Sequence, residues 1–226
     1  MLSVVCALFD GGDNVPDFSR CYSPLWVDKL YRGVCKHLGE PFRFVCLTHY
    51  PQRAFLEPVE AVPFLHDNRR WTCLMEAFRP NIVGERAILM GLDTIIRGPL
   101  DELAAYRGKV AMCRAVGAPQ CSYNNAVMLY DAEIAQRLWL EWSADPTGWE
   151  KRWLICGKPS ELAFIDGTLK AWGVVPDLLE TLFPGQALCY NYASSDEEMR
   201  AARVVWFFGH TKPHNMHQQF LKDAWT

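Results

Sequence analysis

The sequence lacks the cysteine spacings that are typical of disulfide-bonded or zinc-binding proteins. Its nine cysteines are scattered along 226 residues, odd in number, and never in a C-x-x-C spacing. This distribution indicates neither a disulfide framework nor a zinc site. Cys6, Cys46 and Cys113 lie in apolar runs, where a thiol behaves as a small core hydrophobe. We therefore expect a reducing, cytoplasmic setting.

Long hydrophobic segments and an excess of positive charge are also missing. No apolar run approaches the roughly 20 residues needed to cross a bilayer. The first residues, 1–9, have no basic head and no small-residue cleavage site of a signal peptide. The formal net charge is −3, whereas a phosphate backbone is bound by a clustered positive surface. We expect no membrane span and no nucleic-acid partner.

Several catalytic and metal signatures are absent as well. The loop Asp10-Gly11-Gly12-Asp13 does not follow the G-x-G-x-x-G pattern of a dinucleotide-binding turn. There is no G-x-S-x-G elbow, and no cysteine has a companion histidine at a recognisable spacing. Three histidines lie close together at 210, 214 and 217, but no cysteine or acidic residue accompanies them. This favours a polar C-terminal tail over a metal site, and we place the tail at about 215–226.

What the sequence does contain is an alternation of strand-like and helix-like segments. Apolar runs predict strands at 3–9, 43–48, 86–92, 110–116, 126–130 and 203–208. Helical periodicity predicts helices at 25–38, 71–78, 132–142 and 160–172, with Asp131 and Ser160 as N-caps. The opening strand, helix and strand form a β-α-β unit, which requires a mostly parallel sheet. Without a repeat or a break in composition, residues 1–226 are expected to form a single α/β domain.

Three segments carry a more specific signal. The run from Val204 to His214 joins an apolar strand to a Gly209-x-x-Lys212-Pro213 turn. The segments Leu89–Leu103, which contains Asp93, and Ser122–Leu129, which contains Asn124, overlap strand-like runs. Together with Tyr190-Asn191-Tyr192 they resemble, in the right order, segments of glycosyltransferase family 8, the glycogenin-like retaining sugar transferases. The resemblance covers the chain from Val4 to about His214 and implies a GT-A-like fold with a central mixed, mostly parallel sheet flanked by helices.

In that family, two carboxylates of a D-x-D motif and the histidine of the last strand bind Mn²⁺ or Mg²⁺. This sequence keeps only the second carboxylate, as Asp93; Gly91 and Trp206 stand where the other two ligands are expected. Mn²⁺ or Mg²⁺ would depend on Asp93, and two of the three expected ligands cannot bind a hard cation. Trp206 is interpreted either as core packing or as a cap over the place of the metal.

The resemblance also implies the other site residues. Lys212, with Gly209, would contact the donor diphosphate, and the strand end at Ala7, Leu8 and Phe9 would lie beside the nucleotide. This agrees with the rule that open α/β sheets bind ligands at the carboxyl ends of their strands. Two catalytic candidates follow from the same alignment: Asn124 in the sugar pocket, and Glu161, which falls on the family's D-Q pair.

Three functional hypotheses remain open on these residues. The first is a retaining transferase of hexosyl type that uses a UDP-sugar and an unknown acceptor, with Lys212 neutralising the diphosphate without metal. The second is a degenerate relative that binds a nucleotide or a protein partner without sugar transfer. The third is an ordinary transferase in which another residue completes the metal site. The fold alone does not choose among them.

Overall fold

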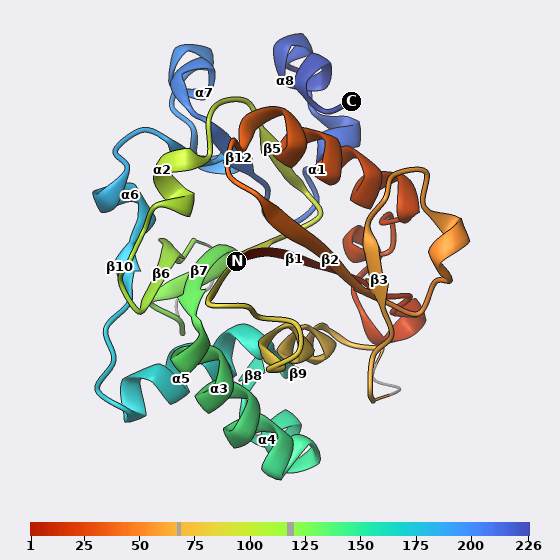
Figure 1. The fold of residues 1–226 in the computed structure, drawn as a ribbon, viewed down its shortest axis with the longest axis vertical. Coiled ribbons are helices and arrows are strands. Elements are labelled where there is room, and N and C mark those ends of the chain that lie inside the picture. Colours follow the sequence, from red (N-terminus) through yellow and green to blue (C-terminus); the bar gives the residue numbers. More distant parts are fainter. Residues whose placement is uncertain (67–68, 117–119) are drawn as a thin grey trace.

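A seven-stranded sheet forms the centre of the protein in the computed structural model, which describes residues 1–66, 69–116 and 120–226 (Figure 1). Its strands are β1 (Leu2–Leu8), β2 (Phe42–Thr48), β3 (Glu60–Val62), β4 (Arg86–Met90), β6 (Val110–Arg114), β7 (Tyr123–Asp131) and β10 (Asp177–Leu178). Their order across the sheet is β10-β6-β7-β4-β1-β2-β3. The β1 strand pairs in parallel with β2 and β4, β2 with β3, and β10 with β6, whereas β7 runs antiparallel to β4 and β6.

Each face of this sheet packs against its own helices. In β1, Val4, Cys6 and Leu8 join the core on the side of α1 (Pro24–His37), while Val5 joins the opposite core. This alternation follows from the period of two in a strand. The opposite core is covered by η4 (Trp71–Phe78), α3 (Ala132–Ala144) and α5 (Glu161–Ala171). The remaining helices are short: α2 (Asp101–Ala104), α4 (Pro146–Arg152), α6 (Leu179–Leu182), α7 (Asp196–Ala201) and α8 (Gln219–Ala224).

A second sheet of three strands stands at one end of the first. It contains β5 (Thr94–Ile96), β12 (Val204–Trp206) and β11 (Ala187–Cys189), in the order β11-β12-β5. Because β5 follows β4 after a short turn, Asp93 lies at the junction of the two sheets. A two-stranded ribbon of β8 (Leu154–Ile155) and β9 (Lys158–Pro159) completes the strands of the described residues.

The expected fold class is confirmed: a mixed, mostly parallel sheet lies between helices. Both expected helix caps are present, since Asp131 accepts from the Ile134 amide at 2.8 Å and Ser160 from the Ala163 amide at 3.2 Å. The strand expected to reach residue 92 ends at Met90, because the chain turns there and the Thr94 amide donates to the Gly91 carbonyl at 3.1 Å. The helix at 71–78 is a 3₁₀ helix.

The segment at about 215–226, expected to be a polar tail, contains buried residues and a short helix. Met216 is 1% and Leu221 0% exposed, and α8 gives this segment a regular helix. The Lys29 ammonium donates to the Trp225 carbonyl at 3.0 Å and lies 3.8 Å from the centre of the Trp225 ring. Met216 and Leu221 join the core of the small sheet with Ile95 and Val205, and Trp225 contacts α1. Among the described residues, no helix has the length and apolar character that a membrane crossing requires.

Candidate functional site

A buried ion pair lies where the two sheets meet. The Lys212 ammonium is 2.5 Å from Oδ2 of Asp93, and the two residues are 4% and 8% exposed. Asp93 occupies the turn between β4 and β5, and Lys212 is the residue before η6 (Pro213–Asn215), after the last strand. The left-handed backbone at Gly209, with φ of 66°, bends the chain between β12 and Lys212. The fold thus joins residues that are 119 positions apart.

Tyr22 completes this arrangement. Its hydroxyl donates to the same Oδ2 of Asp93 at 2.9 Å. Burial, followed by the negative charge of Asp93, raises the pKa of Tyr22 well above its ordinary value, so the phenol remains a donor at neutral pH. The Tyr22 ring packs edge-on against Trp26 in α1, with centroids 5.0 Å apart. Asp93 therefore receives two donors on one oxygen, from two distant segments.

Aromatic side chains lie around the ammonium. The Lys212 nitrogen is 5.5 Å from the centre of the Phe18 ring and 5.5 Å from that of Tyr22. Phe18 lies on η2 (Asp17–Ser19), between Trp71 at 6.4 Å and His210 at 5.0 Å. The loop between β1 and α1 thus supplies both rings, Phe18 and Tyr22, that lie 5.5 Å from the ammonium.

The neighbouring positions do not fit a divalent cation. Gly91 has no side chain, and a Cβ there would lie 3.0 Å from Oδ1 of Asp93. Trp206 is 1% exposed within the core and offers only an indole N–H, which donates rather than ligates. Oδ2 of Asp93 already receives Lys212 and Tyr22. Within the described ranges, no three His, Cys, Asp or Glu side chains are grouped to hold a metal. The cation beside Asp93 is the ammonium of Lys212.

A second carboxyl group, that of Glu161, lies at the start of α5. Its Oε1 accepts from the Asn125 amide at 3.2 Å, while its Oε2 is buried without a hydrogen-bond partner. Glu161 is partly exposed as a residue, but its carboxyl group is enclosed, and the carboxyl is what titrates. Burial raises the pKa of Glu161 to about 7, against the lowering effect of the Asn125 hydrogen bond. Near neutral pH this group can hold or release a proton.

The backbone connects the two carboxyl groups. The Gly91 amide donates to the Ala126 carbonyl at 2.8 Å, and Ala126 is next to Asn125 on β7. Because β7 is antiparallel to β4, the start of β7 lies at the edge where β4 ends, as the pairing of Met90 with Val127 shows. We name this edge, where β1 and β4 end, the carboxyl edge of the sheet.

The other predicted residues lie near the carboxyl edge through their backbone or through local hydrogen bonds. Ala7 and Leu8 end β1 and Phe9 follows, so their backbone reaches the carboxyl edge, while the Leu8 side chain is 1% exposed in the core. Asn124 uses its side-chain oxygen locally, accepting from the Ala126 amide at 2.8 Å. It is Asn125, not Asn124, that contacts Glu161.

Sequence reasoning missed Tyr22, Phe18 and Asn125 as parts of the site. Nothing in the sequence pattern around Tyr22 or Phe18 marks them, since their partners lie far along the chain. The signal that could have found Asn125 is its place directly after the predicted Asn124.

Comparisons with known proteins identify the fold. No family model matches the sequence, and no curated protein matches it. Among solved structures, the glycosyltransferase GlyE of Streptococcus pneumoniae TIGR4 is similar with a TM-score of 0.66 and 13% identity, over 100% of this chain and 60% of GlyE. The chain thus spans less than two thirds of GlyE.

Two further glycosyltransferase structures are similar. An active-site mutant of LgtC has a TM-score of 0.62 at 11% identity, over 98% of this chain and 93% of LgtC. The bifunctional glycosyltransferase WbbM has a TM-score of 0.58 at 11% identity, over 95% of this chain and 47% of WbbM. At such identities the likeness establishes the fold: the chain has the GT-A-like architecture of these glycosyltransferases.

Proposed function

We propose that the chain is a retaining glycosyltransferase of the family 8 type that takes a UDP-sugar donor and requires no divalent cation. The observation that carries the proposal is the lysine ammonium at the carboxyl edge, next to the one remaining carboxylate of the D-x-D segment. The shared fold supports sugar transfer as the class of reaction. A crystal structure of LgtC contains donor and acceptor sugar analogues.

Lys212 would neutralise the leaving diphosphate. An ammonium has three N–H donors, and Asp93 engages one of them. The other donors remain for diphosphate oxygens, whose negative charge grows as the glycosidic bond breaks. Asp93 and Tyr22 would hold the ammonium in place before the donor arrives, so that the cation does not have to be ordered during the reaction.

The donor must first reach the ammonium. Lys212 is 4% exposed, and the rings of Phe18 and Tyr22 lie over it. Tyr22 is anchored by its hydrogen bond to Asp93, whereas the Phe18 side chain has no polar group and packs against the rings of Trp71 and His210. We expect donor binding to displace the Phe18 ring.

Glu161 would act at the sugar. Its unpaired Oε2 and raised pKa suit a group that interacts with developing positive charge or exchanges a proton at neutral pH. The amides of Asn124 and Asn125 would bind sugar hydroxyls beside it. The second candidate function, nucleotide or protein binding without transfer, is favoured by one observation: Asp93 already compensates the charge of Lys212.

Ligand-dependent stability tests donor and metal together. The melting temperature would be measured with UDP-, GDP- and dTDP-sugars, each with Mn²⁺ and with EDTA. A donor at 100 times its dissociation constant adds about 2.7 kcal/mol of stability. We expect stabilisation by UDP-sugars that is equal in Mn²⁺ and EDTA. A tenfold loss of affinity on chelation would contradict the metal-free proposal.

A charge-neutral double variant, Lys212→Gln with Asp93→Asn, isolates the role of the cation. It removes both members of the buried pair, so neither charge is left unpaired. We expect it to fold and to lose donor binding. Release of UDP from the intact protein, with and without an acceptor panel, then separates the two functions: binding without UDP release would favour the non-catalytic one.

A further inference from the structure

A groove lies at the opposite, amino edge of the sheet, where β2 begins and α1 ends. Its volume is about 540 Å³, within the range that holds small ligands. The nearest groove residue on α1 (Pro24–His37) is Tyr31, nine residues after Tyr22, which is about 14 Å along a helix. The groove is therefore separate from the Asp93 and Lys212 site.

One wall of the groove is built from flat apolar rings. Tyr31 and Phe42 line it as half-buried rings, and the buried Phe44 supports Tyr31 edge-on, with centroids 5.2 Å apart. Pro41 and Pro58 add two more rings to the lining. Such faces contact the C–H faces of a ligand rather than its polar groups.

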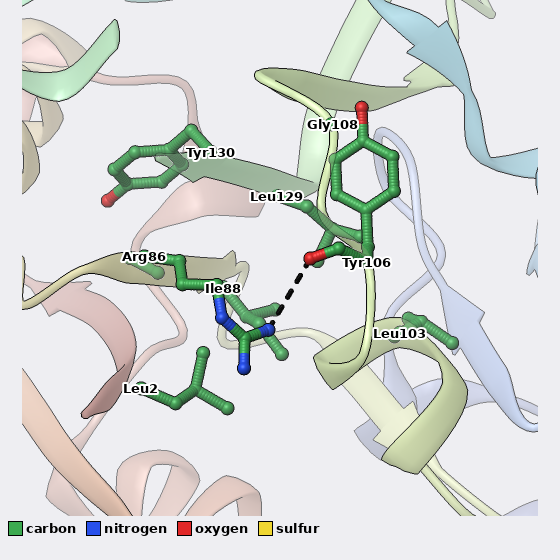
Figure 2. Close-up of a pocket in the computed structure, with 9 residues that line it drawn as sticks. Leu2, Arg86, Ile88, Leu103, Tyr106, Gly108, Leu129 and Tyr130 are labelled. Carbon is green, nitrogen blue, oxygen red and sulfur yellow. Dashed lines mark hydrogen bonds between the residues drawn. The ribbon is translucent and has the colours of Figure 1, made fainter. Parts of the chain in front are cut away.

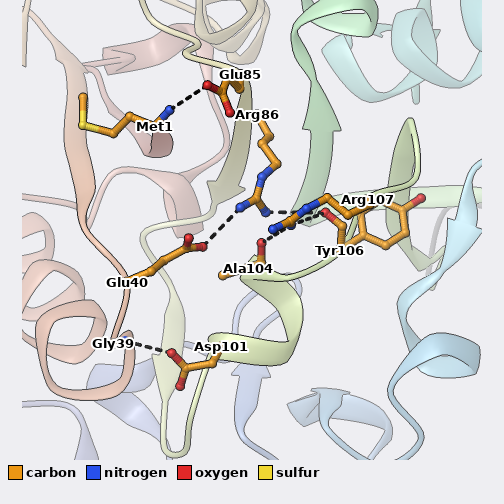
Figure 3. Close-up of polar contacts among 9 residues, drawn as sticks. All are labelled: Met1, Gly39, Glu40, Glu85, Arg86, Asp101, Ala104, Tyr106 and Arg107. Atoms are coloured by element: carbon orange, nitrogen blue, oxygen red, sulfur yellow. Dashed lines mark hydrogen bonds and ion pairs between the residues drawn. The ribbon is translucent and has the colours of Figure 1, made fainter.

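The polar groups of the groove are already balanced in charge. Arg43 forms two hydrogen bonds with Glu60, at 2.7 Å and 3.1 Å. Glu40 lies 3.4 Å from the Arg86 guanidinium (Figure 3). A groove with paired charges of both signs offers donors and acceptors without attracting a strongly charged ligand.

The turn that carries Glu40 is hydrogen-bonded to the start of α2. Figure 3 shows the Gly39 amide directed at Asp101, which accepts from it at 2.9 Å, on the same side as the Glu40 and Arg86 pair. The Leu100 amide also donates to the His37 carbonyl at 2.7 Å. Both hydrogen bonds join this turn to the start of α2.

A neighbouring crevice shows the contrast. Its volume is about 10 Å³, which is room for about one water molecule. Figure 2 shows the Arg86 side chain of this crevice directed at Tyr106. The Arg86 guanidinium donates across it to the Tyr106 carbonyl at 3.4 Å. That crevice is filled by its own side chains, whereas the groove is open.

We propose that the groove at the amino edge is a binding site for a neutral oligosaccharide. Flat C–H faces and many hydroxyls match its rings and its balanced donors and acceptors, and a net charge on the ligand would gain nothing there. Binding would not involve a nucleotide or sugar transfer, so the proposal does not rest on the function proposed above.

Cys35 provides the test, because it lines the groove and is exposed. Its labelling by a maleimide dye would be timed in the full chain carrying Cys156→Ser, which removes the other exposed thiol. The probes are maltohexaose, cellohexaose and chitohexaose, with glucose for comparison. For a dissociation constant of about 1 mM, about 10 mM ligand should slow labelling about tenfold.

Two matched variants make the result specific. Glu60→Ala removes a groove acceptor on an exposed side chain, and should weaken the protection at least severalfold. Glu133→Ala removes a similar exposed partner, in this case of Lys109, outside the groove, and should change nothing. Labelling that no hexasaccharide slows overturns the proposal. Slow labelling of Cys35 in the absence of sugar, together with self-association of the protein, would also overturn it, because a second copy of the chain would then occupy the groove.

Discussion

Asp93 and Glu161 lie at the same edge of one sheet, yet their surroundings are opposite. Oδ2 of Asp93 receives an ammonium and a phenol hydroxyl. Glu161 receives one amide hydrogen bond on Oε1, and its Oε2 has no partner. A compensated carboxylate holds the structure together, whereas an uncompensated one lowers stability when it ionises. The difference separates a carboxylate that is fixed by two donors from a carboxyl group whose proton can be held or released near neutral pH.

Removing the ammonium of Lys212 should have the largest effect on stability, because it leaves Asp93 without its charge partner. Lys212→Met leaves Asp93 buried without its charge partner, and we expect a loss of about 3 to 5 kcal/mol in the free energy of unfolding. Urea denaturation measures it. Adding Asp93→Asn to the same chain should recover part of the loss, since no unpaired charge remains. Equal losses in the single and double variants would show that the pair is not coupled.

Glu161 should show the reverse behaviour. Its pKa is about 7 in the folded chain and 4.5 ordinarily, so the folded state binds the proton more tightly. The penalty is absent below pH 4.5, grows as pH rises, and is complete above pH 7. Glu161→Gln should therefore gain on the order of 2 to 3 kcal/mol relative to the parent at pH 8, but not at pH 4. A gain that does not vary with pH would contradict the assignment. If Glu161 acts at the sugar, the same variant loses transfer activity.

Tyr22→Phe sharpens the comparison by removing one of the two donors to Asp93. A hydrogen bond to a charged group contributes about 1.5 to 3 kcal/mol, and the retained ion pair places the expected loss near the lower end. Thermal and urea unfolding measure it. Tyr192→Phe is the control, because Tyr192 is 59% exposed. Equal behaviour of the two variants would mean that the Tyr22 hydroxyl does not stabilise Asp93.

The smallest effect is expected at Asn125. Asn125→Ala removes the hydrogen bond that lowers the pKa of Glu161, so that pKa should rise further. The stability loss should be about 1 kcal/mol. The informative measurement is the stability difference that Glu161→Gln causes, followed against pH. Its midpoint would be compared between the parent chain and the chain that carries Asn125→Ala. An unchanged midpoint would show that the amide does not tune the carboxyl.

The sequence predicts the frame of the fold well because that frame depends on local patterns. The run at 3–9 is apolar enough to be a buried strand, and Asp131 and Ser160 cap their helices through contacts within three residues. Short elements such as β3 and β10 carry no such pattern. They exist because neighbouring strands offer them hydrogen bonds.

The site was predictable only where a motif named it. Asp93 and Lys212 were expected at one site, and the structure joins them directly. Tyr22 was not expected, because its part depends on a contact with a residue 71 positions away. The same holds for α8, whose packing on α1 depends on Trp225 meeting Trp26 and Lys29. Contacts of this kind follow from the assembled fold and leave no periodicity in the sequence.

The separation of 119 residues between Asp93 and Lys212 also bears on how the protein is made. At a synthesis rate of about 5 to 20 residues per second, Asp93 leaves the ribosome roughly 6 to 24 seconds before its lysine does. During that interval β5 has no β12 to pair with, and the carboxylate can stay in water. Closing of the small sheet then withdraws both charges from solvent together. The ion pair thus marks a late step of folding, and a nascent chain halted before Lys212 should keep that junction open.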